Sequence, residues 1–248
     1  MIRPIATDRR MTAMVTALLL ASCSAPTNEP ERAAAVESSR DWVIPPRVET
    51  VRADAGSLVF TGLGQPGGRV VLRTDAGAAF AAVADASGGF EIRMARPAGD
   101  LVLHPETQRG QDAAPSPETI LVLAGGPIAM LSPGIPTRRL DAGSSLGAID
   151  TDGRVMVLSG RAVAGASVKV SVSGRDVPMD VTADAEGHWM AVLPDTGAAQ
   201  IRINGTIFDY PGGRAGSGDF QVQQAGQGWT VHWSAPDGAR QTTWLPTT

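Results

Sequence analysis

The chain has 248 residues, a formal net charge of −4, and abundant glycine and proline, with 29 and 18 residues respectively. The mildly acidic balance, without a basic run, argues against a nucleic-acid-binding protein. Beyond residue 23 no apolar stretch approaches the ~18 residues of a membrane-spanning helix, which argues against a polytopic membrane protein.

Residues 1–22 have the three-part composition of a secretory signal peptide. Arg3, Arg9 and Arg10 form a positive region, and the uncharged run Met11–Leu20 follows it. A helix of about ten residues reaches only about 15 Å, half of the hydrocarbon core of a bilayer. The run is therefore too short for a stable transmembrane anchor, and the pattern predicts export of the chain.

The residues that follow this run are Leu20, Ala21, Ser22 and Cys23, and they resemble the lipobox of bacterial lipoproteins. Cys23 is the only cysteine, and lipidation would account for an unpaired thiol in an exported protein. The resemblance implies a membrane anchor through a lipid on Cys23. Because Ser24 follows the cysteine, it also implies the periplasmic side of the outer membrane in a Gram-negative host, or the outer face of the plasma membrane in a Gram-positive one.

Residues 23–46 are polar, aperiodic and dotted with proline, so they are expected to form a flexible tether. A coil of this length has a root-mean-square reach on the order of 25 Å. The tether would hold the following domains clear of the lipid headgroups.

An internal repeat follows, with one copy over Ser57–Met94 and a second over Arg154–Leu193. Each copy has alternating apolar residues, a glycine turn, further alternation and an Asp-Ala-x-Gly segment, which predicts half-buried strands joined by hairpins. In each hairpin we expect the aspartate to cap its own backbone and the glycine to take a positive φ. The matched pairs are Gly62 and Gly160, Gly67 and Gly165, Val70 and Val168, Asp85 and Asp184, Gly88 and Gly187, and Phe90 and Trp189.

This pattern resembles that of tandem bacterial immunoglobulin-like domains, over about residues 47–126 and 145–210. The resemblance implies a small Greek-key β-sandwich for each copy. Residues 127–144, rich in proline and glycine, are predicted to be the linker between them. Residues 211–248 are expected to form a glycine-rich break and a three-stranded β-meander packed on the second sandwich. The predicted fold class is thus all-β: two tandem immunoglobulin-like β-sandwiches plus a C-terminal three-stranded β-meander.

The chain offers little local evidence for catalysis or for a bound cofactor. No nucleophile motif or closely spaced metal-ligand set is present, so we predict neither an enzyme nor a cofactor requirement. Asp150 and Asp152 resemble the opening of a calcium loop, but the glycine comes too early and the closing glutamate is missing, so a turn is the favoured interpretation. His188 and His232 each neighbour a tryptophan and are expected to face solvent.

Three tryptophans near the C-terminus form the one group that could bind a ligand. Trp229 and Trp233 are expected on one strand face, with Trp244 on the next strand. Exposed aromatic faces can stack on sugar rings; alternatively, the rings supply the hydrophobic face that a short meander needs.

These observations favour a membrane-anchored, non-enzymatic envelope lipoprotein, a scaffold or adhesion-type protein that contacts an envelope protein or glycan through its sandwiches. The alternative is a carbohydrate- or peptidoglycan-binding lipoprotein that uses the tryptophan-rich meander. Nucleic acid is not expected as a partner.

Overall fold

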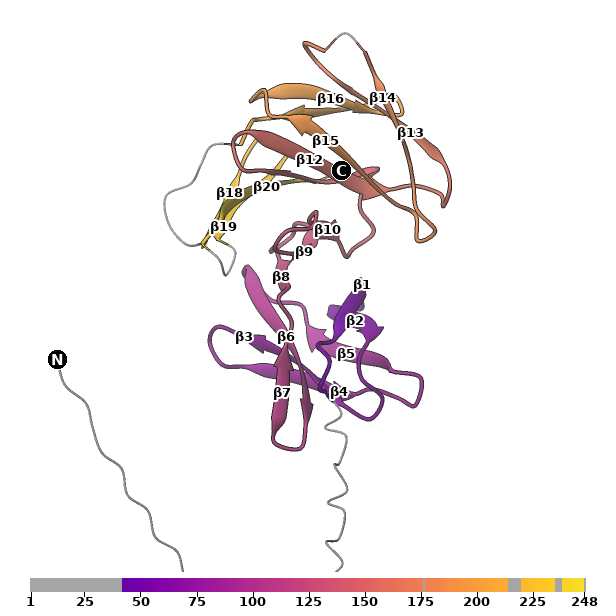
Figure 1. Ribbon diagram of the computed structural model, residues 1–248. Coiled ribbons are helices and arrows are strands. Elements are labelled where there is room, and N and C mark those ends of the chain that lie inside the picture. The colour runs from indigo at the N-terminus through magenta and orange to yellow at the C-terminus, as the bar shows by residue number, and fades with distance from the viewer. Residues whose placement is uncertain (1–41, 176, 214–219, 235–237, 248) are drawn as a thin grey trace, which may run out of the picture. The chain divides into compact units, whose positions relative to one another are not determined.

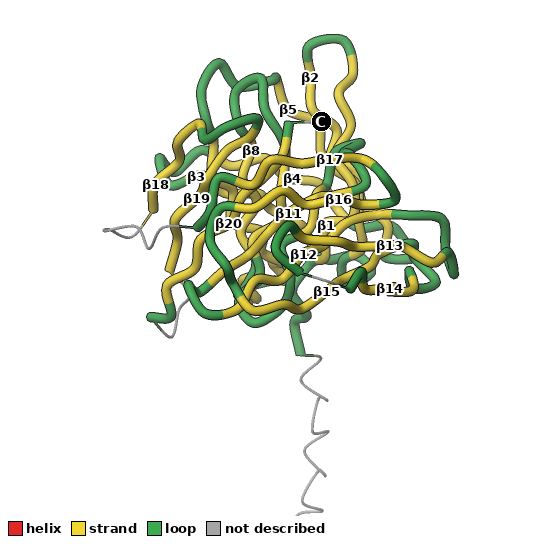
Figure 2. The backbone as a smooth tube through the Cα atoms, turned by 90° about the horizontal axis from the view of Figure 1, so that it is seen from above, coloured by secondary structure: helices red, strands yellow, loops and turns green. Residues whose placement is uncertain are grey.

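The computed structural model describes residues 42–175, 177–213, 220–234 and 238–247 (Figure 1). These residues form twenty strands, paired antiparallel, and no helix (Figure 2). Within them there is accordingly no helix long and apolar enough to cross a membrane. The predicted signal peptide, the lipobox and most of the tether lie outside the described residues.

The first sandwich consists of two sheets around one apolar core. The smaller sheet has the order β1-β2-β5, and the larger has the order β10-β9-β8-β6-β3-β4, with β7 paired to β6. Phe60 and Phe90 from the smaller sheet meet Leu72 and Leu103 from the larger in this core. The strands are β1 (Arg47–Asp54), β2 (Ser57–Leu63), β3 (Arg69–Thr74), β4 (Ala79–Val83), β5 (Gly89–Ala95), β6 (Leu101–Arg109), β7 (Asp112–Pro115), β8 (Thr119–Val122), β9 (Ile128–Leu131) and β10 (Arg138–Arg139).

The second sandwich is built in the same way. One sheet has the order β15-β12-β11-β20-β19-β18, and the other has the order β14-β13-β16-β17. Trp189, Ile149 and Ile201 are among the side chains buried between them. The strands are β11 (Leu146–Thr151), β12 (Val155–Arg161), β13 (Ser167–Val172), β14 (Met179–Thr182), β15 (His188–Pro194), β16 (Ala199–Ile203), β17 (Thr206–Tyr210), β18 (Phe220–Gln224), β19 (Gly228–Ser234) and β20 (Arg240–Pro246).

The two sandwiches share one strand order, which confirms the all-β sandwich fold class. In the first, β1-β2-β5 faces β4-β3-β6-β8; in the second, β11-β12-β15 faces β14-β13-β16-β17. Strands β5 and β15 also have the same alternation of buried and exposed residues. The large side chains expected between the sheets, Phe90 and Trp189, are both buried.

The repeated hairpins have the geometry that their residues predict. Asp85 Oδ1 accepts hydrogen bonds from Ser87 N and Gly89 N at 2.8 and 2.9 Å. Asp184 Oδ1 likewise accepts from the amides two and four residues further on, at 3.0 and 2.7 Å. Gly88 and Gly187 have φ angles of 87° and 80°, which side chains with a Cβ disfavour. Each hairpin is therefore fixed locally by its aspartate and its glycine.

The expected linker, residues 127–144, differs from the prediction because part of it belongs to the first sandwich. Ile128–Leu131 forms β9, which pairs with β8. Ile128 and Met130 enter the core of the first sandwich, whereas Ala129 and Leu131 are buried on the opposite face. Both faces of this strand are covered, so its sequence has no alternation that would distinguish a strand from an apolar turn.

The C-terminal meander, which was expected to pack on the second sandwich, is part of one of its sheets. Strand β20 pairs with β11, with Trp244 opposite Ile149, so the meander continues a sheet of that sandwich edge to edge. A third apolar cluster then joins the outer face of this extended sheet to the outer face of β8 and β9. Its buried members are Leu121, Leu123, Ala129 and Leu131 from the first sandwich, and Ala148, Val231, Trp233 and Leu245 from the second.

Candidate functional site

The three tryptophans do not form a common ligand-binding face. Trp229 and Trp233 lie on one face of β19, whereas Trp244 lies opposite Thr230 on the other face of the sheet. Trp244 is 1% exposed in the core of the second sandwich, and Trp233 is 7% exposed in the cluster between the sandwiches. Trp229 is half-buried against that same cluster. The candidate sugar-binding face is therefore hydrophobic packing, as the alternative interpretation held.

The two aspartates of the candidate calcium loop have different environments, and neither belongs to a metal-binding group. Asp150 is buried, and its carboxylate accepts hydrogen bonds from Thr137 N, Thr137 Oγ1 and Thr243 Oγ1 at 2.7, 2.7 and 2.6 Å. Asp152 Oδ1 caps a turn through Arg154 N and Val155 N. Across the described residues, no group of three or more metal-ligating side chains is placed to hold an ion. The turn interpretation therefore describes Asp152, whereas Asp150 lies within β11 and accepts its hydrogen bonds from residues distant in the sequence.

The buried Asp150 belongs to a clamp that holds the segment after β9 against both sandwiches. Thr137 donates to Asp150, and its carbonyl accepts from Ser159 Oγ at 2.7 Å. Arg139 Nη1 donates to Pro246 O at 2.8 Å, while the next residue, Leu140, lies in the first core. Burial raises the pKa of Asp150, against the opposing effect of its three hydrogen bonds. We call residues 137–140 the clamp segment.

The expectation that His188 and His232 face solvent is wrong. His232 is 6% exposed, and its Nδ1 lies 2.9 Å from Thr242 Oγ1. His188 is partly buried, and its Nε2 is enclosed without a hydrogen-bond partner among the described residues. Alternation within one strand could not reveal the burial of either ring, because it depends on residues distant in the sequence, such as Arg138 near His188 and Thr242 near His232.

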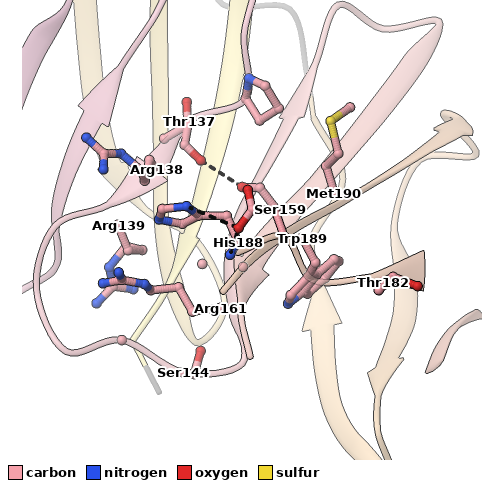
Figure 3. A pocket seen from close by; sticks show the side chains of 15 residues that line it. Thr137, Arg138, Arg139, Ser144, Ser159, Arg161, Thr182, His188, Trp189 and Met190 are labelled. Carbon is pink, nitrogen blue, oxygen red and sulfur yellow. Dashed lines mark hydrogen bonds and ion pairs between the residues drawn. The ribbon is translucent and has the colours of Figure 1, made fainter. Parts of the chain in front are cut away.

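His188 contributes to a pocket of about 350 Å³ between the clamp segment and the outer edge of β12 and β15 (Figure 3). Guanidinium groups lie on one side of the pocket, the side chains of Trp189 and Met190 lie on the other, and the His188 ring lies between them. The three arginines that line it are Arg138, Arg139 and Arg161, whereas Asp184 is the only acidic residue in the lining.

The arginines of the pocket differ in how many of their donors are already used. Arg139 uses three of its five N–H groups, two in an ion pair with Asp141 and one in a hydrogen bond to Pro246 O. Arg138 Nη2 donates to Val48 O at 2.7 Å, which leaves other N–H groups of that side chain. The side chain of Arg161 is exposed, and no hydrogen bond or ion pair joins its guanidinium to another described residue. Arg161 therefore has the most donor capacity for a ligand.

The pKa of His188 is lowered, first by burial and then by the positive charges of Arg161 and Arg138. Asp184 and Glu186 oppose this effect but do not cancel it. The imidazole is therefore neutral at pH 7, and the positive charge of the pocket comes from its arginines.

Reasoning from the sequence did not find this pocket. Its lining comes from the expected linker, from both strands of the β12–β15 pair and from the hairpin between β14 and β15. Arg161 and His188 are directly opposite each other in the strand register, but 27 positions separate them in the chain. Without knowledge of the β12–β15 pairing, the sequence gives no indication that Arg161 and His188 lie together.

No protein-family model matches the chain, and no curated protein sequence matches it. Among solved structures, it is similar to a Ca²⁺-stabilized adhesin that helps an Antarctic bacterium reach out and bind ice, at 11% sequence identity and a TM-score of 0.23. The match covers 83% of this chain and 66% of the adhesin chain, just under two thirds of its length. A likeness at this TM-score does not assign a function to the chain.

Proposed function

We propose that this chain is a lipid-anchored, non-enzymatic interaction protein of the bacterial envelope, of scaffold or adhesion type. In this proposal the two sandwiches act as one stiff body that presents its binding surface at a fixed position beyond the tether. The observation that supports it is the apolar cluster between the sandwiches, together with the clamp segment. A buried apolar interface restrains the relative motion of domains, whereas small polar interfaces leave them free to move.

The stiffness can be measured by the distance between two spin labels, one on each sandwich. Cys23→Ala removes the only cysteine, so Val83→Cys and Ile207→Cys, at exposed strand positions, give unique attachment sites. We expect a single narrow distance distribution. Leu131→Asp, in the middle of the apolar cluster, should broaden it while the circular dichroism of the sheets persists. A broad distribution in the parent chain would contradict the proposed stiff body.

The interaction role is tested by binding of the lipid-free Cys23→Ala protein to separated envelope fractions. We expect saturable co-sedimentation with one fraction, either outer-membrane vesicles or isolated sacculi, and competition by unlabelled protein. Heat-denatured protein is the control for nonspecific adsorption. If no fraction retains the protein saturably, the interaction role is wrong.

The anchor is tested separately by labelling cells with a fatty-acid analogue. We expect the protein to take up the label through Cys23 and to partition with membranes, and we expect Cys23→Ala to lose both properties. Ser24→Ala leaves the thiol in place and should still be labelled, which controls for a general effect on export. Label that persists in the Cys23→Ala protein would overturn the lipid anchor.

A further inference from the structure

We propose that the pocket beside the clamp segment binds a small organic oxyanion, a carboxylate or phosphate group attached to an apolar or aromatic body. The site goes beyond the proposed interaction role, because it is a small-molecule site within the second sandwich and its margin. Loss of this ligand site would leave the stiffness of the two-sandwich body and the proposed membrane anchor unchanged.

The charge of the lining selects an anion. Three guanidinium groups line the pocket, and one of them, on Arg139, is already ion-paired with Asp141. The one carboxylate in the lining, on Asp184, already caps its own hairpin, so Arg138 and Arg161 leave the pocket positive. Arg161 is available to a ligand, and Arg138 has donors beyond the one that Val48 O accepts. A guanidinium offers a planar pair of N–H groups that matches the two oxygens of a carboxylate or phosphate.

The wall of the pocket opposite the arginines is apolar, and it determines which non-ionic part the ligand can have. The indole N–H of Trp189 is used on Ser145 O at 3.2 Å, so the ring offers only hydrocarbon to the pocket. Met190 is 49% exposed beside it, and Pro136 adds a further apolar surface. A volume of about 350 Å³ lies at the lower end of the range of small-molecule pockets. The site therefore suits an anion that carries a compact apolar group.

His188 provides an internal reporter of an occupied pocket. The charged groups that act on its ring are Arg161 and Arg138, which lower its pKa, and Asp184 and Glu186, which raise it. An anion bound between the arginines offsets their charge, so the pKa of His188 should rise on binding. By linkage, the anion should then bind more tightly as the pH falls through the pKa of His188.

The test uses the full chain with Cys23→Ala and four probes that share a phenyl ring: benzoate, phenyl phosphate, benzyl alcohol and benzylamine. Binding is measured by calorimetry and by the imidazole NMR signals of the three histidines, with His188 assigned through His188→Gln. We expect benzoate and phenyl phosphate to bind and to raise the His188 pKa. The tighter of the two identifies a carboxylate or a phosphate as the preferred group.

The matched variants separate recognition by Arg161 from general electrostatics. Arg161→Gln should weaken benzoate or phenyl phosphate about tenfold, and Arg161→Lys should recover part of that loss. Arg202→Gln removes an exposed arginine from β16 in the opposite sheet and should leave the affinity unchanged. The proposal is overturned if neither anion binds, if benzyl alcohol binds as well as benzoate, or if Arg161→Gln and Arg202→Gln have the same effect.

Discussion

Replacing Gly160 by alanine is expected to lower the free energy of unfolding by about 3 kcal/mol or more, one of the largest effects of any single substitution in the chain. A Cβ at this position would overlap with the carbonyl oxygen of Ser145 and would lie 2.7 Å from Cζ2 of Trp189. A backbone carbonyl in a paired strand cannot move aside as a flexible side chain can. Urea unfolding followed by tryptophan fluorescence measures the loss.

The repeat supplies a second test of the same contact. Gly62 is the equivalent position of the first sandwich, and a Cβ there would overlap with the carbonyl oxygen of Arg47. We expect Gly62→Ala to lower the free energy of unfolding by a similar amount. Gly99→Ala is the control, because nothing lies within 4 Å of its Cβ position, and its effect should stay within about 0.5 kcal/mol. Equal effects at Gly160 and Gly99 would show that the close approach is unimportant.

Asp150→Ala is expected to destabilise the chain by about 3–5 kcal/mol, because it leaves buried hydrogen-bond donors without an acceptor and without access to water. The amide and hydroxyl of Thr137 and the hydroxyl of Thr243 would lose their shared acceptor. Thr243 also accepts from the indole of Trp233 at 3.0 Å, so the loss extends into the apolar cluster. Asp152→Ala is the matched control, since that carboxylate only caps an exposed turn, and it should cost about 1 kcal/mol or less.

The same carboxyl gives stability a pH dependence with a defined sign. Because burial raises the folded-state pKa of Asp150, the native chain binds more protons than the unfolded chain between about pH 4 and that pKa. Its contribution to stability is therefore present in full below about pH 4 and is lost as the pH rises through the folded pKa. Asp150→Asn cannot titrate, so the stability gap between wild type and Asp150→Asn should narrow with rising pH over this window. A gap that widens instead would show that the folded pKa is lowered.

The sequence predicted those parts of the fold that depend only on residues close together in the chain. The hairpins at Asp85 and Asp184 depend on a carboxylate, a glycine and the amides within four residues of each aspartate. Alternation placed Phe90 and Trp189 inward in each copy. These features need no knowledge of distant partners, so the repeated pattern predicted them and the sandwich class.

The features that the sequence did not predict all depend on contacts between residues that lie far apart in the chain. Strand β9 is buried on both faces, so its side chains show no period that would mark it as a strand. His232 is buried although its neighbour in the sequence, Trp233, lies on the other face of the strand. The arginine pocket requires the register that sets Arg161 opposite His188 and the clamp segment that closes one side. No short sequence motif encodes the strand register or the position of the clamp segment.

The position of β20 has a consequence for the order in which the chain can fold as it is synthesised. It lies between β11 and β19 in its sheet, although it is the last strand of the described residues. The first sandwich emerges earlier, but Leu121 and Leu131 on its outer face stay uncovered until Val231 and Leu245 arrive. A chain that is made from its N-terminus must therefore keep this apolar surface exposed until residues 231–245 have been made. A stop codon just before residue 240 would make the exposure permanent.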